Sequence, residues 1–533
     1  MKIKKFHYGS LLLCGFLLAT SCVDNNYDLS DIDTTSAVKL DGLTIPVNLS
    51  EITLNQVLDI DKESDGIVAV YTDAAGKEYY AIKQDGSFNA DPVKIDELRL
   101  VDNVSVPSFT MPAINGNATS LSVDFSYLIK NVDPSLLYLT YFGLKEGYYM
   151  QIDLDINPAP VSVSGLKIKI PETYVAVYNN QTFNDGIIPV EIVNGSLQYP
   201  IYVTKMEFNP SIPNIDNVLN IGGKIGIESG SINSGGNDLT FQFKMSPFTV
   251  NVVSGGINYE VEAPSINPVE LNDLPDFLTS GETNLVLQNP QLYLNFASLY
   301  GANYNTGLTI SPEGTGTKDT YIKMDPFKTS IALAPDVDDL GLPDLLKSPV
   351  LQKAPQLQYV LSGNGLPEKL NITLDNPYLD GDVEMITLGT EPGIELSGSY
   401  TFFTPLSFAS DSKIIYMKKE QDFFGDDIKK VEVTELQVTT DVTTNLPFEV
   451  NLTVYALDKD GNRIENASAS AKVPVNAQGY LLDLHFDKPF TGLNGVEIVV
   501  TADQMNGDTL TPDQFIKLEN IRATITGELV AKF

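Results

Sequence analysis

Cysteine offers the most specific chemistry in this chain of 533 residues, which contains Cys14 and Cys22 and no other cysteine. Three lysines near the start precede an apolar run, Leu11 to Leu18. Small residues at 19–21 then lead directly to Cys22 and polar sequence. A charged segment, a short apolar core and small residues predict a secretory signal peptide over residues 1–21. The Cys22 sulfur is then the nucleophile on which a diacylglycerol thioether can form.

Residues 19–22 resemble the lipobox of bacterial lipoproteins in its relaxed form, since Ala19 stands where leucine is commonest. The resemblance implies a lipid, such as a palmitate-containing diacylglycerol, on Cys22 and a membrane anchor. Residues 22–40 would form a flexible tether, because their polar start cannot bury apolar surface. The alternative is an ordinary secretory peptide with an incidental cysteine.

Charge and thiol content exclude several functions. Removing residues 1–21 takes away three lysines and no acid, which leaves 31 basic and 69 acidic residues, a formal charge of 31 − 69 = −38. Such a surface repels phosphates, so we expect no nucleic-acid partner. With Cys14 removed and Cys22 acylated, the folded body has no thiol for a disulfide, a cysteine nucleophile or a zinc-thiolate site.

His485 is the single histidine of the folded body and lies between Asp483 and Asp487. In this segment Leu482, Leu484 and Phe486 alternate with those polar residues, so the histidine should lie on the solvent face of a strand. It could ligate a metal there, although an ordinary polar strand face is the favoured interpretation. We expect no catalytic residue, metal or cofactor.

Carboxylates and tyrosines leave two further possibilities open. Asp-rich turns such as DKDGN (458–462) and DNPYLDGDVE (375–384) could bind calcium, but Asp and Gly also occur in turns for backbone reasons. The adjacent pairs Tyr79-Tyr80 and Tyr148-Tyr149 should each place one ring in an exposed position or at a sheet edge, where it could contact a glycan or a protein, although covering a sheet face is the favoured interpretation. A cleft with two carboxylates would indicate a glycoside hydrolase.

The elements that hold these residues should be strands. Short alternating runs separated by Gly, Pro, Asn and Asp recur along the chain, which indicates an all-β protein. In residues 448–456 the apolar side chains alternate with polar ones before the Asp458–Gly461 turn. Residues 67–87 should form a hairpin followed by a second turn at Asp85-Gly86.

Asn-Pro pairs interrupt several strands, as in LVLQNPQLYLNF (285–296) and ITLDNPYLDGDVEM (372–385). Proline cannot donate to a ladder and restricts the residue before it, so each pair should mark a bend or a crossing between sheets. Composition changes then suggest β domains at 41–205 and 206–424, a charged linker at 417–430, and an immunoglobulin-like β-sandwich at 425–533.

The stretches CVDNNYDLSDIDTT (22–35), DGLTIPVNLSEITLNQVLDID (41–61) and residues 401–461 carry a family resemblance. The chain resembles a group of large uncharacterised outer-membrane lipoproteins of Bacteroidetes bacteria. Its strand, Asn-Pro, strand pattern is also loosely similar to late-embryogenesis-abundant type sandwiches. The resemblance implies an outer-membrane anchor and tandem β domains, with no activity to transfer to particular residues.

Function is therefore predicted only as a class. A non-enzymatic, lipid-anchored cell-envelope protein whose β-sandwich surfaces bind a protein or glycan is the leading hypothesis. The alternatives are a structural or assembly subunit of a surface complex and, third, a carboxylate-dependent glycoside hydrolase. The membrane leaflet and the oligomeric state stay open.

Overall fold

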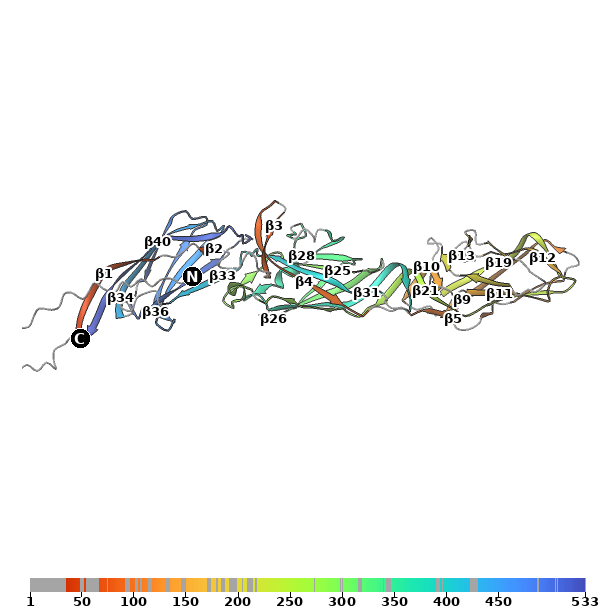
Figure 1. Ribbon diagram of the computed structural model, residues 1–533, viewed down its shortest axis with the longest axis horizontal. Coiled ribbons are helices and arrows are strands. Elements are labelled where there is room, and N and C mark those ends of the chain that lie inside the picture. Colours follow the sequence, from red (N-terminus) through yellow and green to blue (C-terminus); the bar gives the residue numbers. More distant parts are fainter. Residues whose placement is uncertain are drawn as a thin grey trace, which may run out of the picture.

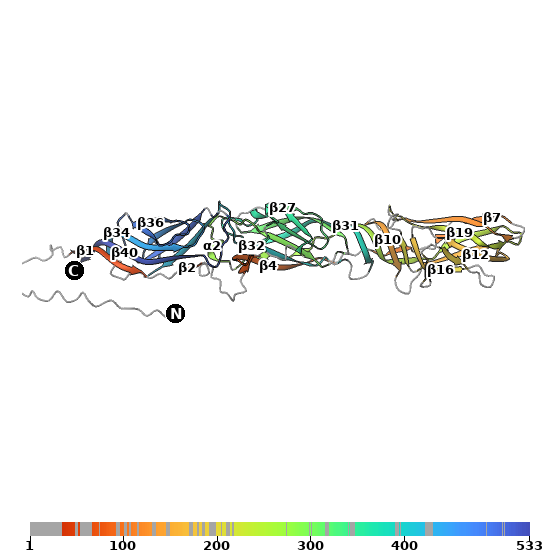
Figure 2. The ribbon, with the colours of Figure 1, turned by 90° about the horizontal axis from the view of Figure 1, so that it is seen from above.

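Three β-sandwich bodies lie in line and give the chain an elongated shape (Figures 1 and 2). This computed structural model describes residues 35–532 with gaps, the longest of which are 54–66, 191–198 and 422–429. We call the bodies the base, the middle body and the distal body. The all-β, multi-domain sandwich class expected from the sequence is confirmed.

The base contains both the first and the last described strands. One of its sheets has the order β1-β40-β34-β37, and β2 and β38 pair onto it. The other has the order β33-β39-β35-β36. The bounds are β1 Thr35–Val47, β2 Ile52–Thr53, β33 Lys413–Glu420, β34 Val431–Thr444, β35 Val450–Leu457, β36 Arg463–Val473, β37 Tyr480–Phe486, β38 Phe490–Thr491, β39 Gly495–Asp503 and β40 Phe515–Lys532.

The base confirms the predicted alternation. In β35, Val450, Leu452, Val454 and Ala456 are buried while the residues between them are not, because strand side chains point to alternate faces. Strand β37 repeats the pattern in the opposing sheet. Two inner faces of this kind pack into one core.

The middle body pairs a seven-stranded sheet with part of a larger one. The smaller sheet has the order β22-β4-β32-β25-β28-β29, with β3 on β4. Its strands are β3 Val68–Thr72, β4 Glu78–Asn89, β22 Ser265–Ile266, β25 Gln291–Phe296, β28 Ser330–Ala334, β29 Val350–Lys353 and β32 Gly398–Pro405. A two-stranded sheet (β24 Leu285–Val286, β30 Ser362–Gly363), α2 (Asp276–Thr279) and the 3-10 helix η3 (Pro355–Tyr359) complete it.

The large sheet extends from the middle body toward the distal body (Figure 1). Its main order is β14-β13-β17-β10-β21-β31-β26-β27. The bounds are β5 Leu98–Leu100, β10 Leu136–Leu144, β13 Tyr174–Tyr178, β14 Gln181–Phe183, β17 Lys205–Phe208, β18 Asn214–Ile215, β21 Phe248–Glu260, β23 Val269–Glu270, β26 Asn303–Glu313, β27 Thr320–Lys323 and β31 Lys369–Thr387. Long strands shared in this way join the two bodies.

The distal body adds two five-stranded sheets at the end remote from the base (Figure 2). The first contains β6 Val104–Ser105, β7 Phe109–Met111, β11 Met150–Asn157, β16 Tyr199–Val203 and β20 Leu239–Met245. The second contains β8 Asn117–Ala118, β9 Leu121–Lys130, β12 Ser162–Lys169, β15 Ile187–Val190 and β19 Val218–Asn233.

The bodies are nested along the chain, which differs from the predicted serial domains. Strand β1 pairs antiparallel with β40 over eleven residue pairs, from Thr35 opposite Lys532 to Val47 opposite Ile521. The strands that follow β2 belong in sequence order to the middle body, the distal body, the middle body again and finally the base. Residues 35–40, expected in the tether, are therefore strand. Residues 413–420, which overlap the expected linker, are β33 of the base.

Two local predictions had different outcomes. The hairpin of β3 and β4 is present, but Asp85 and Gly86 lie inside β4 and form no turn. Gly86 is needed there because a Cβ atom would collide with the Tyr400 ring. The Asn-Pro pair at 289–290 separates strands of different sheets, as expected. At 376–377 it bends β31, where Asn376 has a φ of 47°.

The base and the middle body are joined by backbone hydrogen bonds. The Tyr80 N–H donates to Leu510 O (3.0 Å), and the Leu406 N–H donates to Tyr80 O (2.9 Å). The Leu510 N–H returns a bond to Leu406 O (2.9 Å). One continuous cluster of buried apolar residues extends from Val68 to Ile525 through all three bodies. The bodies are therefore fixed to one another more firmly than domains on open linkers.

Candidate functional site

The predicted lipidation site, Cys22, lies outside the described residues, so the anchor stays a prediction. The part of the chain that the structure describes contains no helix long and apolar enough to cross a membrane.

His485 lies on the solvent face of β37, as predicted, beside the Asp483 side chain of the same strand. Its Nε2 atom is 3.1 Å from Asp483 Oδ2, and both side chains are exposed. The Gln437 amide of the neighbouring strand β34 donates to Asp483 at 2.9 Å. Asp487 lies outside the described residues. Among the residues that are described, no group of three or more His, Cys, Asp or Glu could hold a metal ion.

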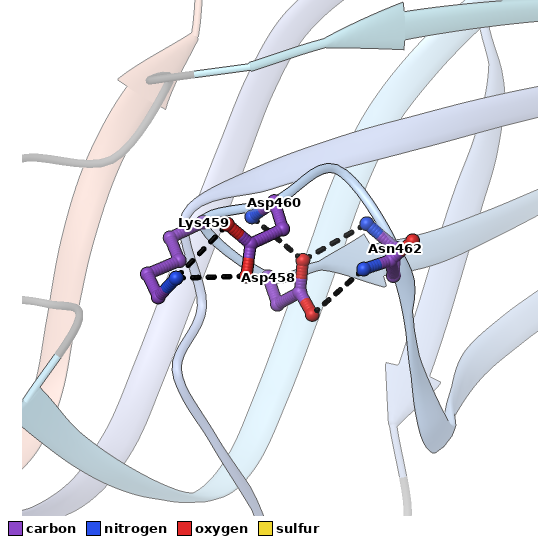
Figure 3. A network of polar contacts seen from close by, with 4 residues as sticks. All are labelled: Asp458, Lys459, Asp460 and Asn462. Atoms are coloured by element: carbon purple, nitrogen blue, oxygen red, sulfur yellow. Dashed lines mark hydrogen bonds and ion pairs between the residues drawn. The ribbon is translucent and has the colours of Figure 1, made fainter.

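The DKDGN segment forms the turn between β35 and β36 (Figure 3). Asp458 Oδ1 accepts hydrogen bonds from the backbone N–H groups of Asp460 (2.8 Å) and Asn462 (2.9 Å). The bond from Asn462 is the main cause that lowers the pKa of Asp458. Asp458 therefore works here as a turn residue, in agreement with the favoured interpretation.

The expectation that one tyrosine of each adjacent pair is exposed is wrong for Tyr79 and Tyr80, which are 7% and 0% exposed. The β4 sheet is covered on both faces. Tyr80 lies in the main core, whereas Tyr79 packs with Phe403 in a second small cluster. The Tyr79 hydroxyl donates to Gly341 O at 2.8 Å. Tyr148 and Tyr149 lie outside the described residues.

A different set of tyrosines lies on the outer face of the large sheet. Tyr321 on β27 is 58% exposed, Tyr378 on β31 is 38% exposed, and Tyr138 on β10 is partly exposed. Asp380 and Asp382 follow Tyr378 at alternate positions of β31 and share its face, since Leu379, after Tyr378, and Val383, after Asp382, are buried. We call these five residues the tyrosine face.

Glycines set the ring orientations on the tyrosine face. Gly307 of β26 lies beneath Tyr321, where a Cβ atom would stand 2.6 Å from the ring. Gly256 of β21 lies beneath Tyr138, and a Cβ atom there would also collide with the ring. Each ring therefore rests over a position without a side chain, and its other side is left toward solvent. Flat, partly exposed rings of this kind are suited to stacking.

Neighbouring side chains hold the carboxylates of this face in place. The Tyr138 hydroxyl donates to Asp382 across β21, which also raises the pKa of Tyr138. The Asn303 amide donates to Asp380 Oδ1 at 3.1 Å. Each carboxylate can still accept further bonds, because its two oxygens offer about four acceptor positions.

Sequence reasoning did not identify this face, because it interpreted DNPYLDGDVE as an Asp-rich turn, whereas the structure places that stretch inside β31. Tyr378, Asp380 and Asp382 lie in the DNPYLDGDVE stretch, where their spacing of two residues places them on one side of a strand. Tyr138 and Tyr321 are far away in sequence and join them only through the strand order β10-β21-β31-β26-β27. That order was not readable from a single sequence.

Comparisons with known proteins show no family for this chain. No protein-family model and no curated protein matches the chain. A solved structure from Parabacteroides distasonis, described as a "putative secreted protein", is similar over 52% of this chain and 89% of that one. The two are 15% identical and superpose with a TM-score of 0.34.

Proposed function

We propose that this protein is a non-enzymatic, lipid-anchored component of the bacterial outer membrane that presents β-sheet surfaces for binding on a stiff rod. The observation that carries the proposal is the β1–β40 ladder. It places the start of the described chain at the outer end of the base, opposite the distal body (Figure 1). Only about a dozen residues separate Cys22 from Thr35. A lipid on Cys22 would therefore hold the base near the membrane.

Stiffness supports the same function. The continuous core and the shared large sheet connect the bodies without an exposed linker between them in the described residues. A stiff rod keeps a binding surface at a fixed distance from the membrane, which a flexible string of domains does not. The net charge favours solubility of the rod and repels other acidic surfaces.

Cys22→Ser tests the anchor. The native chain should be found in the membrane fraction and incorporate radiolabelled palmitate. The variant should incorporate none and be recovered without detergent. A variant that stays in the membrane fraction and takes up the label equally would overturn the anchoring mechanism. Absence of turnover on neutral polysaccharides and esters would agree with a non-enzymatic role, whereas turnover abolished by acid-to-amide changes would contradict it.

A role as an assembly subunit is favoured by one separate observation. Strand β1 ends the sheet β1-β40-β34-β37, so in the described part of the chain no strand pairs with its outer edge. Such an edge can accept a strand from another chain. Recovery of a stoichiometric partner that is lost when β1 is altered would support this second function.

A further inference from the structure

We infer that the tyrosine face of the large sheet binds an uncharged glycan. The inference deepens the proposed function by assigning its binding surface to Tyr138, Tyr321, Tyr378, Asp380 and Asp382. Tyr138 lies on β10, Tyr321 on β27, and the other three on β31, within the strand order β10-β21-β31-β26-β27.

The dimensions of the face suit an extended chain. Five adjacent strands span about 19 Å at the usual spacing between strands, and the register places Tyr138 level with Asp382 but Tyr321 level with Thr373, about 30 Å further along β31. Tyr138 and Tyr321 lie on the outermost two of these strands, and Tyr378 lies on the central one. The rings therefore form separate stacking positions on one surface, as a ligand of several sugar rings requires.

Ring orientation favours sugars as the ligand. A pyranose presents C–H groups on its faces and hydroxyls around its rim. The ring of Tyr321, resting over Gly307, can stack against such a face. Around the tyrosines, Asp380 and Asp382 offer fixed acceptors for hydroxyl donors, and Asn258 lies opposite Asp380 in the sheet register.

Charge selects among glycans. The described face carries Asp375, Asp380, Asp382 and Glu384, while Lys323 is the cation beside Tyr321 on β27. An anionic polysaccharide would be repelled from such a surface, whereas a neutral one would not. These carboxylates already accept hydrogen bonds from neighbouring side chains. Asp375 accepts one from the Thr309 hydroxyl at 2.6 Å, as Asp380 and Asp382 accept theirs from Asn303 and Tyr138. Carboxylates held in place in this way are suited to accept hydrogen bonds from the hydroxyl groups of a glycan.

A binding assay with the full mature chain tests the inference. Affinity electrophoresis or calorimetry would use the neutral polysaccharides laminarin, dextran and yeast mannan as probes, with polygalacturonate and polylysine as charged probes. We expect at least one neutral probe to bind and polygalacturonate not to bind. Tyr321→Ala and Tyr378→Ala should each weaken binding about tenfold. Tyr480→Ala is the matched control, because Tyr480 is 42% exposed on the base, and it should change nothing.

Two further measurements keep the test decisive. Gly307→Ala should weaken binding while retaining every tyrosine, since its Cβ atom displaces the Tyr321 ring. Binding of a neutral glycan should also persist from low to high salt, whereas binding of a cationic polypeptide would collapse. No binding of any neutral probe, equal binding by all variants, or salt-sensitive binding of polylysine alone would overturn the inference. The palmitate experiment would be unaffected by any of these results, so failure of the glycan site and failure of the anchor are distinguishable.

Discussion

Thr35 at the start of β1 lies opposite Lys532 at the end of β40, although nearly the whole chain separates them in sequence. The pairing closes the base around both ends of the described chain. The middle and distal bodies are thus inserted in the sequence between β1 and β40, two paired strands of one sheet. This arrangement allows an N-terminal lipid and the C-terminal sandwich to lie at the same end of the rod.

The β1 ladder should hold without a covalent link to the rest of the chain. A protease site inserted within residues 54–66 would separate β1 and β2 from everything that follows. We expect the two pieces to stay together under native conditions, because eleven residue pairs join β1 to β40. Gel filtration before and after denaturant checks this. Separation of the pieces in native buffer would show that the ladder contributes little.

The ion pair of Arg463 and Glu497 should respond asymmetrically to mutation. Glu497 on β39 is 2% exposed and lies 2.5 Å from Arg463 Nε, whereas the Arg463 side chain is 44% exposed. Arg463→Met leaves a buried carboxylate whose remaining cation, Lys419 Nζ, is 3.8 Å away. We expect a loss of about 2–3 kcal/mol in the free energy of unfolding, reduced from the fully buried case by solvent around the arginine.

Glu497→Gln should cost less, about 1 kcal/mol, because it retains an acceptor and leaves the uncompensated charge on the partly exposed arginine. Denaturant unfolding of both variants measures the difference. A larger loss for Glu497→Gln than for Arg463→Met would contradict the view that the buried carboxylate dominates this pair.

Tyr304→Phe should be neutral or stabilising by up to about 1 kcal/mol. Tyr304 is fully buried, and its hydroxyl has no hydrogen-bond partner among the described residues. Its ring packs against Phe296 and Phe327, contacts that phenylalanine would retain. Thermal unfolding of the variant checks the sign, and a clear loss of stability would reveal a partner for the hydroxyl.

Alkaline pH should destabilise the protein through buried tyrosines. Burial raises the pKa of Tyr80 and of Tyr400 to about 12, from an ordinary value of 10.0. The neutral form is thus favoured by folding, so this stabilisation is fully present below pH 10 and is lost as the pH rises toward 12. Tyrosinate absorbance should show delayed ionisation in the native protein and ordinary ionisation in denaturant. Ionisation of every tyrosine near pH 10 without unfolding would contradict it.

The sequence revealed local features because they depend on neighbouring residues. The alternation around Leu482, Leu484 and Phe486 follows from the two-residue period of a strand, and the Asp458 turn follows from the short reach of its carboxylate. The Asn-Pro breaks were recognisable for the same kind of reason, since proline restricts its immediate neighbour.

Long-range pairing was not recognisable. Nothing in residues 35–47 indicates that their partner is β40. Changes in composition along the chain predict domains that follow one another, whereas in this fold the base is built from both ends of the described chain. The Tyr79-Tyr80 prediction failed because it assumed one open sheet face, whereas Tyr79 is buried against Phe403 and its hydroxyl donates to Gly341 O. The tyrosine face was not predicted from the sequence, because strand order alone brings Tyr138 and Tyr321 into the same sheet as Tyr378.

The position of the rod on the membrane is the central claim, and single-cysteine fluorescence energy transfer tests it most directly. The proposed mature chain has no cysteine other than Cys22, so Lys39→Cys in the base and Ala159→Cys beyond β11 in the distal body would each carry one donor dye. In proteoliposomes with acceptor lipids, we predict strong transfer from position 39 and little from position 159. Equal transfer from both positions, or stronger transfer from the distal body, would contradict an anchored, outward-pointing rod.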